Sequence, residues 1–126
     1  MIILDSDILI EILDKKSSKG NEALKKVVES GERIATTAIN LHEILYGLHK
    51  YGKTVKELLN MPILDYTKND AILASKIELE AEKRGKAISR TDAMIAAIAI
   101  DNGARLYTFN SKHFLDTAKE GLMFFE

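Results

Sequence analysis

Acidic and amide side chains recur along the chain where such groups could do chemistry. Two carboxylates, Asp5 and Asp7, follow the apolar run Ile2-Ile3-Leu4 near the N-terminus. Further candidates along the chain are Glu43, Asp92 and Asn110. Carboxylate and amide oxygens are hard ligands, typical of Mg²⁺ or Mn²⁺ sites. The chain has no cysteine, so a metal site could use only oxygen and imidazole ligands. We interpret Asp5 as the first ligand of a divalent metal site.

Each of these acids also has a purely structural interpretation. Ser6 or Asp7 could simply cap a helix from about residue 8 to 14. A lone Glu43 on a helix is usually solvated. Asp92 at the start of a helix could serve only to stabilise the helix dipole, an effect worth about 0.3 to 1 kcal/mol. The choice depends on whether the fold brings these side chains into one crevice.

Apolar periodicity and turn residues divide the chain into alternating strands and helices. Strands are expected at 2–4, 33–36, 61–64, 105–108 and 122–125, and helices at about 8–14, 22–30, 38–50, 54–60, 69–84 and 91–100, with a helical turn at 112–116. This alternation predicts an α/β fold, with a parallel sheet covered by helices on both faces. Right-handed crossovers would bring Asp5, Asp92 and Asn110 to one edge of the sheet, and Glu43 would face them from a helix.

Size and composition favour an ordinary globular protein. A chain of 126 residues is expected to form a single domain over 1–126 that buries roughly two-thirds of its unfolded surface. The net charge of −1 gives no global attraction to nucleic acid, so an RNA partner would need local positive charge. The longest apolar run, 93–100, is too short for a membrane span, and no basic segment precedes the first strand. We therefore expect a cytoplasmic protein with no membrane partner.

Two familiar motifs match by spacing and fail by context. Residues 47–54 satisfy the phosphate-loop pattern GxxxxGK[ST], but the pattern follows a predicted helix, whereas a phosphate loop follows a strand. A helix C-cap is the favoured interpretation. The pair His42-Glu43 begins the zinc-protease pattern HExxH, but Tyr46 replaces the second histidine.

Two phosphoryl-transfer classes are weighed on the same grounds. A phosphatase with an Asp-x-Asp nucleophile motif usually carries a hydroxyl two residues later, where this chain has Leu9. A phosphoacceptor receiver domain could use Asp65 after the third strand and Lys112 after the fourth. That assignment leaves Glu43 and Asp92 without a role, so the receiver domain stays a distant alternative.

Four segments together resemble a PIN domain, in particular the small toxin ribonucleases of the VapC type. They are ILDSDILIE at 3–11, TAINLHEILYG at 37–47, DAMIAAIA at 92–99 and LYTFNSKHF at 106–114. Their order and spacing extend over nearly the whole chain. The resemblance implies a three-layer α/β/α PIN-like domain with a central, mostly parallel sheet of about four to five strands.

The resemblance also implies roles for individual residues. Asp5, Glu43 and Asp92 match the family's metal ligands for Mg²⁺ or Mn²⁺, and Asn110 stands where the catalytic set often has a fourth Asp. Ser6, Asp7 and Thr108 are expected to support these ligands, with Asp7 replacing a frequent Asn. The implied activity is that of an endoribonuclease that hydrolyses RNA with water, leaving a 5′-phosphate and a 3′-hydroxyl.

The partners follow from the same resemblance. It implies a homodimer, the toxin of a VapBC-type pair, inhibited by a cognate antitoxin protein. Four basic residues in or beside loops near the crevice are candidates for contacts with RNA phosphates, although each could also be a solvated surface charge: Arg84, Lys86, Arg90 and Lys112. The alternative function is a catalytically inactive PIN module that binds RNA or a protein, because Asn110 removes one charge from the site.

Overall fold

The computed structural model describes residues 1–48 and 52–126. Its strands are β1 (Ile2–Leu4), β2 (Ile34–Thr37), β3 (Ile63–Leu64), β4 (Arg105–Tyr107) and β5 (Met123–Phe124). Its α-helices are α1 (Ser6–Leu9), α2 (Ser18–Ser30), α3 (Ala38–Leu48), α4 (Gly52–Leu59), α5 (Lys68–Lys83) and α6 (Arg90–Asp101). A π-helix, η1 (Ile10–Lys15), continues α1, and a 3₁₀-helix, η2 (Ser111–Glu120), follows β4.

The five strands form one parallel sheet in the order β3-β2-β1-β4-β5, which confirms the predicted α/β class. β1 lies at the centre, where Ile2 pairs with Ile34 of β2 and with Arg105 of β4. β3 lies at an edge and is shorter than expected, with Pro62 immediately before it. Because all strands are parallel, the residues that follow them meet at one edge of the sheet.

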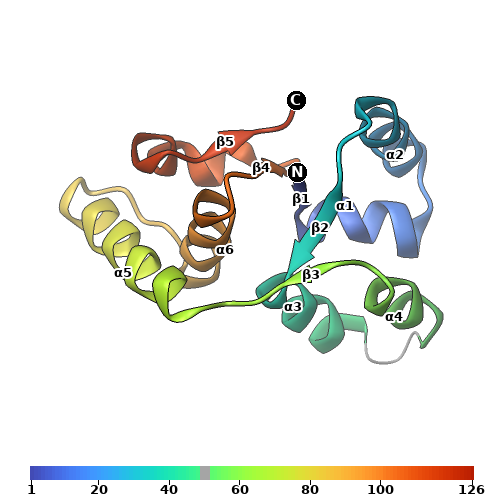
Figure 1. The fold of residues 1–126 in the computed structure, drawn as a ribbon, viewed down its shortest axis with the longest axis horizontal. Coiled ribbons are helices and arrows are strands. Elements are labelled where there is room, and N and C mark those ends of the chain that lie inside the picture. Colours follow the sequence, from blue (N-terminus) through green and yellow to red (C-terminus); the bar gives the residue numbers. More distant parts are fainter. Residues whose placement is uncertain (49–51) are drawn as a thin grey trace.

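Helices cover both faces of the sheet, and each face has its own core (Figure 1). Ile3 of β1 points into the core that contains α5 and α6, whereas Ile2 and Leu4 point into the core that contains α1, α2 and α3. Successive strand residues point to opposite faces, so a strand covered on both sides needs an unbroken apolar run. The three layers predicted for a PIN-like domain are therefore confirmed.

The second helix begins earlier than the sequence suggested. α2 starts at Ser18, not near residue 22, because the Ser17 hydroxyl accepts a hydrogen bond from the Gly20 backbone N–H at 3.0 Å. Gly20 permits close packing of α2 on η1, since a Cβ there would lie 2.1 Å from the Glu11 carbonyl oxygen. Gly20 is therefore a contact point inside a helix.

Capping also moves the start of α6. The Ser89 hydroxyl accepts a hydrogen bond from the Asp92 backbone N–H at 3.2 Å, so the helix begins at Arg90, one residue before the expected start at Thr91-Asp92. The expected helical turn at 112–116 extends to the whole of η2. The expected end of the helix from residue 38 at Lys50, and part of the 47–54 pattern, lie outside the described residues.

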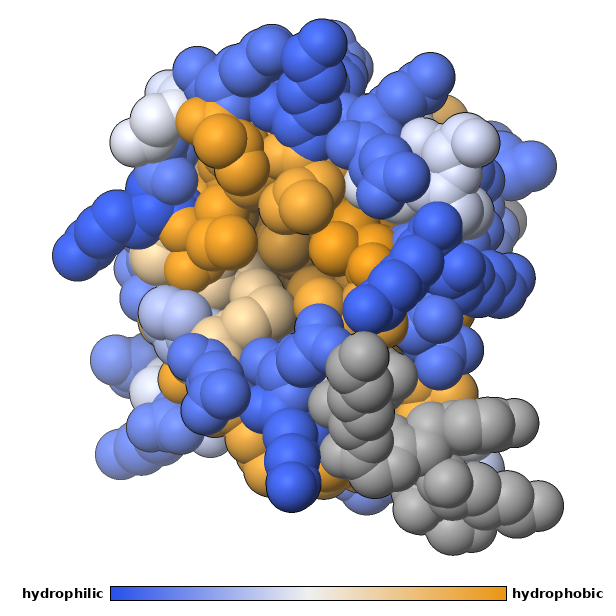
Figure 2. Space-filling view, turned by 90° about the vertical axis from the view of Figure 1, so that its right-hand side faces the viewer, coloured by the Kyte–Doolittle hydropathy of each residue, from blue (hydrophilic) through white to orange (hydrophobic). Residues whose placement is uncertain are grey.

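An apolar surface covers the side of the molecule formed by α2, η1 and α4 (Figure 2). The exposed large apolar residues of these helices are Leu24 and Val28 of α2, with Val28 68% exposed, and Leu59 of α4. Partly buried side chains of η1, Ile12 and Leu13, pack on the core beside them. In the part of the chain that the structure describes, no helix has both the length and the apolar character needed to cross a membrane.

Candidate active site

Asp5 lies where β1 ends, at the centre of the carboxyl edge of the sheet. It is the N-cap of α1, and its Oδ1 accepts a hydrogen bond from the Ser6 backbone N–H at 2.8 Å. The same oxygen accepts a hydrogen bond from the Asn40 side-chain amide, also at 2.8 Å. Only 9% of Asp5 is exposed to solvent. Asp5 therefore caps α1 and is also hydrogen-bonded to Asn40 of α3.

Asn40 is a site residue that the sequence analysis missed. It is fully buried, and its Nδ2 donates to the Ser6 hydroxyl at 2.9 Å as well as to Asp5. The Thr37 hydroxyl donates to Asn40 Oδ1 at 2.7 Å, which fixes the orientation of the amide. Its spacing in the sequence could have identified it: Asn40 stands four residues before Ile44, on the same face of the helix, and these two are the buried residues of α3. A polar side chain on a buried helix face needs hydrogen-bond partners.

Glu43 approaches the site from α3, as the sequence suggested. The Ser6 hydroxyl donates to Glu43 Oε1 at 3.0 Å, so Ser6 connects this carboxylate to Asn40 and through it to Asp5. Glu43 is the exposed end of this network and Asp5 its buried end. The connected side chains come from β1, α1 and α3.

Asp92 faces the same edge from the first turn of α6 and is half-buried. Partial loss of solvent raises the pKa of Asp92 and of Glu43 above their ordinary values. The charge of Asp5 contributes to both increases, and the charge of Asp92 raises the pKa of Glu43 further. Three carboxylates from three separate elements therefore repel one another across a common space.

Asp7 and Asn110 form a second group beside these acids. Asp7 Oδ2 accepts hydrogen bonds from Asn110 Nδ2 and from the Phe109 backbone N–H, each at 3.0 Å. The Thr108 hydroxyl donates to the same oxygen at 3.3 Å. Burial and the Asp5 charge raise the pKa of Asp7. Asp7 thus holds the end of β4 against the start of α1.

The three carboxylates are chemically suited to a hard divalent cation. Asp5, Glu43 and Asp92 offer carboxylate oxygens, and their mutual repulsion would be relieved by positive charge between them. Within residues 1–48 and 52–126, no group of three histidine, cysteine or acidic side chains is placed so that it could hold a metal ion as it stands. Mg²⁺ keeps several of its waters and takes only one or two carboxylates directly, so it does not require a group of three.

The four basic candidates have different surroundings. Arg90 donates two hydrogen bonds to Glu78, from Nε and Nη2, both at 3.1 Å. Arg84 Nε lies 3.9 Å from Asp116 Oδ1. Lys86 and Lys112, in contrast, line one cavity between the loop before α6 and η2. The structure therefore brings two of the four together and engages the other two with acidic side chains.

Comparisons with known proteins agree with this architecture. The family model described as PIN domain matches residues 2–120. A curated relative, Ribonuclease VapC2 of Haemophilus influenzae, is 28% identical over 119 residues, which is 89% of this chain and 88% of that protein.

Solved structures give the same result. The structure of VapBC2 from Rickettsia felis bound to a promoter DNA fragment contains a chain that is 25% identical, with a TM-score of 0.77 and coverage of 99% of this chain and 98% of that one. VapBC-1 from nontypeable H. influenzae matches with a TM-score of 0.78 and 21% identity, covering 100% and 98% of the respective chains.

Proposed function

Because this chain belongs to the PIN domain family, we propose that it is a metal-dependent endoribonuclease and the toxin of a VapBC-type toxin–antitoxin pair. Its similarity over nearly full length to a curated VapC ribonuclease supports the activity. The observation that carries the proposal is electrostatic: Asp5, Glu43 and Asp92 act on one another across the carboxyl edge of the sheet. Folding concentrates the negative charge of three carboxylates there.

We propose that Asp5, Glu43 and Asp92 hold Mg²⁺ or Mn²⁺, with Asn110 beside them. When bound, such an ion lowers the pKa of a water and offsets the charge that develops on a phosphodiester under attack. Asn40 orients Asp5, and Ser6 orients Glu43, through hydrogen bonds of 2.8 and 3.0 Å. Asp7 and Thr108 fix Asn110 through the hydrogen bonds at the end of β4.

The raised pKa of Glu43 and of Asp92 has a consequence for the reaction. Both groups bind protons more readily than free carboxylates do, so acid competes with metal binding at this site. Hydrolysis of RNA is therefore expected to weaken on the acid side of neutrality at a fixed metal concentration. The water attacks phosphorus directly, and no 2′-oxygen of the RNA is needed as nucleophile.

We further propose that the apolar surface over α2 and α4 binds the cognate antitoxin. Solved relatives are complexes of VapC-type chains with their antitoxins, which supports a protein partner of this kind. Leu24 and Val28 of α2 and Leu59 of α4 are exposed, and both helices pack on η1. Figure 2 shows that the side of the molecule formed by these elements is apolar. A partly apolar segment of the antitoxin would remove that area from water. A homodimer of the toxin is proposed on the family resemblance.

The alternative is a catalytically inactive PIN module that binds RNA or a protein partner. The observation in its favour is Asn110, whose neutral amide is hydrogen-bonded to Asp7 in place of a fourth free carboxylate. This alternative predicts RNA binding without cleavage in any divalent metal.

Incubation of total cellular RNA with the purified chain tests the proposal directly. Wild type is compared with Asp5→Asn in EDTA, Mg²⁺ and Mn²⁺, with the variant purified identically as the control for contaminating nucleases. We expect products that require metal and are absent from the variant. Equal cleavage by the two proteins would contradict the assigned site. Folded wild type that binds RNA but leaves it intact in every metal would favour the inactive module.

A further inference from the structure

The end of α6 carries an acid in an unfavourable place. Asp101 is the last residue of the helix, and the C-terminal end of a helix has partial negative charge that disfavours an ionised carboxylate. Asp70 lies against it from the first turn of α5, and a hydrogen bond joins the two carboxyl groups. Asp70 is only 2% exposed, whereas Asp101 is exposed. The fold therefore brings two acidic side chains together where α5 begins and α6 ends.

A hydrogen bond between two carboxyl groups requires a proton. A carboxylate can only accept, so one member of the pair must be protonated and donate its O–H to the other. The helix ends decide which member this is. Asp70 Oδ2 accepts a hydrogen bond from the Thr67 backbone N–H at 2.8 Å, at the positive end of α5, and this contact stabilises a negative charge. The proton therefore resides on Asp101, which donates to Asp70.

The surroundings of the pair agree with this assignment. The hydrogen bond to Asp70, burial and the Asp70 charge raise the pKa of Asp101 above its ordinary value. Burial and the charges of Asp70 and Glu78 raise the pKa of Tyr66, which precedes α5. The Asp70 charge therefore acts on both of these neighbours, and a proton on Asp101 offsets it.

Further charged residues stand on the elements that pack beside the pair. They are Lys68 of α5, Arg105 of β4, and Lys119 and Glu120 of η2. Arg105 forms an ion pair with Glu32. Within the part of the chain that the structure describes, none of the four is among the groups that shift the pKa of Asp101. A shared proton therefore relieves the repulsion between the two carboxylates.

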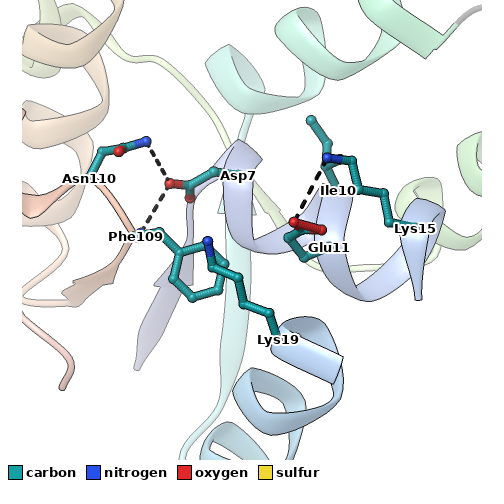
Figure 3. Close-up of a pocket in the computed structure, with 7 residues that line it drawn as sticks. All are labelled: Asp7, Ile10, Glu11, Lys15, Lys19, Phe109 and Asn110. Carbon is teal, nitrogen blue, oxygen red and sulfur yellow. Dashed lines mark hydrogen bonds and ion pairs between the residues drawn. The ribbon is translucent and has the colours of Figure 1, made fainter. Parts of the chain in front are cut away.

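Asp7 in the candidate active site provides a contrast. It also lies beside an acid, but its Oδ2 accepts hydrogen bonds from Asn110 Nδ2 and the Phe109 backbone N–H, which stabilise its charge (Figure 3). At Asp101, the hydrogen-bond partner is another carboxyl group instead. The Asp70–Asp101 hydrogen bond therefore lasts only while the proton is present.

A cavity of about 400 Å³ gives solvent access to the pair. Its lining residues come from both helix ends: Thr67, Asn69, Asp70, Asp101 and Asn102. Asn102 caps α6, and its Nδ2 donates to the Ile98 carbonyl oxygen at 2.8 Å, which holds this end of the helix in place. Because Asp101 is exposed in this cavity, its proton can exchange with water. The pair can therefore respond to the pH of the medium.

The pair lies far from the candidate metal ligand of the same helix. Asp92 is in the first turn of α6 and Asp101 at its end, so they are about 14 Å apart at a rise of about 1.5 Å per residue. Between them, α6 packs with Ala74 and Ile77 of α5 in one apolar core. The contact between Asp70 and Asp101 closes one end of this helix pair.

We propose that Asp70 and Asp101 form a proton-operated latch between α5 and α6. The latch is closed while the two carboxyl groups share a proton, and it loosens when both are ionised, because adjacent negative charges repel each other. The folded-state pKa of Asp101 is raised, so the latch stabilises the helix pair at low pH, and this stabilisation is lost as the pH rises through that pKa. The latch goes beyond the proposed function and requires neither metal nor RNA.

The first test follows the side-chain carboxyl carbons of Asp70 and Asp101 by NMR in EDTA, from about pH 8 down to about pH 3.5. Groups that share a proton titrate together, so a change at Asp101 should also be visible at Asp70. Asp101 should titrate above its ordinary value of 3.8. Independent titration of the two carboxyl groups would refute the latch.

The second test measures hydrogen exchange at two backbone amides that report on the latched helix ends. The Ala71 N–H donates to the Thr67 carbonyl oxygen at 3.0 Å, and the Asn102 N–H donates to the Ile98 carbonyl oxygen at 3.1 Å. In wild type, protection of these amides, corrected for intrinsic exchange, should fall about tenfold between about pH 4 and about pH 7, as expected for loss of a hydrogen bond to a charged group.

Asp101→Asn separates the latch from the acids of the candidate active site, which this variant retains. The amide at position 101 can donate to Asp70 at every pH, so protection should be equal at both pH values. Asp101→Ala, which cannot donate, should show low protection at both. The matched control is Asp65→Asn, the same change at an exposed acid outside α5 and α6, and it should behave like wild type. If Asp101→Asn loses protection with pH as wild type does, the latch is refuted and the pH dependence belongs to other acids.

Discussion

Exchange of Asp7 and Asn110 gives a sharp test of how the site is built. The Asn110 amide donates to Asp7 Oδ2 at 3.0 Å, so Asn110→Asp removes a hydrogen bond and puts a second carboxylate at the same distance. Asp7→Asn alone keeps a neutral partner and relieves repulsion from Asp5. In the double variant, Asn at position 7 can donate to Asp at position 110. The carboxylate–amide pair is then restored, with the two side chains exchanged between the positions.

The magnitude follows from the geometry. Two unit charges about 3 Å apart repel by about 5 kcal/mol at an effective dielectric constant of about 20, and by about 1 kcal/mol in bulk water. Asn110 is exposed and Asp7 half-buried, so we take about 2 kcal/mol. Loss of the hydrogen bond adds about 1 kcal/mol. Asn110→Asp should therefore lower the free energy of unfolding by about 3 kcal/mol, and adding Asp7→Asn should recover most of this loss.

The assay is urea unfolding of wild type, both single variants and the double variant in EDTA at about pH 8 and about pH 5. The penalty in Asn110→Asp should shrink at about pH 5, because close carboxylates raise the folded-state pKa of one another and protonation removes the repulsion. A double variant whose free energy of unfolding equals the sum of the single effects, within about 0.5 kcal/mol, would refute the reasoning.

Further predictions concern the acid network, the apolar surface and helix packing. Asp5→Asn should raise the melting temperature without metal at neutral pH. Wild type should gain stability as the pH falls towards the ordinary carboxyl pKa values of 3.8 and 4.5, because the folded-state pKa values of Asp7, Glu43 and Asp92 are raised. Part of each increase comes from the Asp5 charge, so Asp5→Asn should make this gain smaller. An unchanged pH profile would contradict this. Val28→Glu should abolish binding of the cognate antitoxin in a pull-down and leave RNA cleavage intact, whereas a stable complex would remove α2 from the proposed interface. Gly20→Ala should lower the unfolding midpoint in urea, because the new Cβ would meet the Glu11 carbonyl; an unaltered midpoint would mean that α2 can shift at no cost.

Much of the fold could be predicted because its signals are local. The run Ile2-Ile3-Leu4 has no polar member, and only a strand buried on both faces requires that. The alternation of strands and helices then gave a parallel sheet. Errors were concentrated at helix starts, where several residues able to cap a helix stand close together. Ser17 rather than Asn21 caps α2, which hydropathy alone does not decide.

The placement of candidate site residues was predictable where a residue follows a strand and less so where hydrogen bonds link distant elements. Asp5 directly follows β1, and Asn110 lies shortly after β4. Their position at one edge of the sheet was therefore predictable from topology. The hydrogen bond from Asn40 to Asp5 joins residues 35 positions apart, and no periodicity indicates it. The Arg90–Glu78 ion pair joins α6 to α5 in the same way. The sequence alone had suggested Arg90 as a candidate for contacts with RNA phosphates.

The central claim is that Asp5, Glu43 and Asp92 form one divalent metal site, and the most direct measurement is calorimetric titration with Mn²⁺. Wild type is compared with Asp92→Asn and with Asp101→Asn, which makes the same substitution at the other end of α6. We predict that Asp92→Asn weakens Mn²⁺ binding at least about tenfold, while Asp101→Asn binds like wild type. Equal affinities in all three proteins would contradict the shared site.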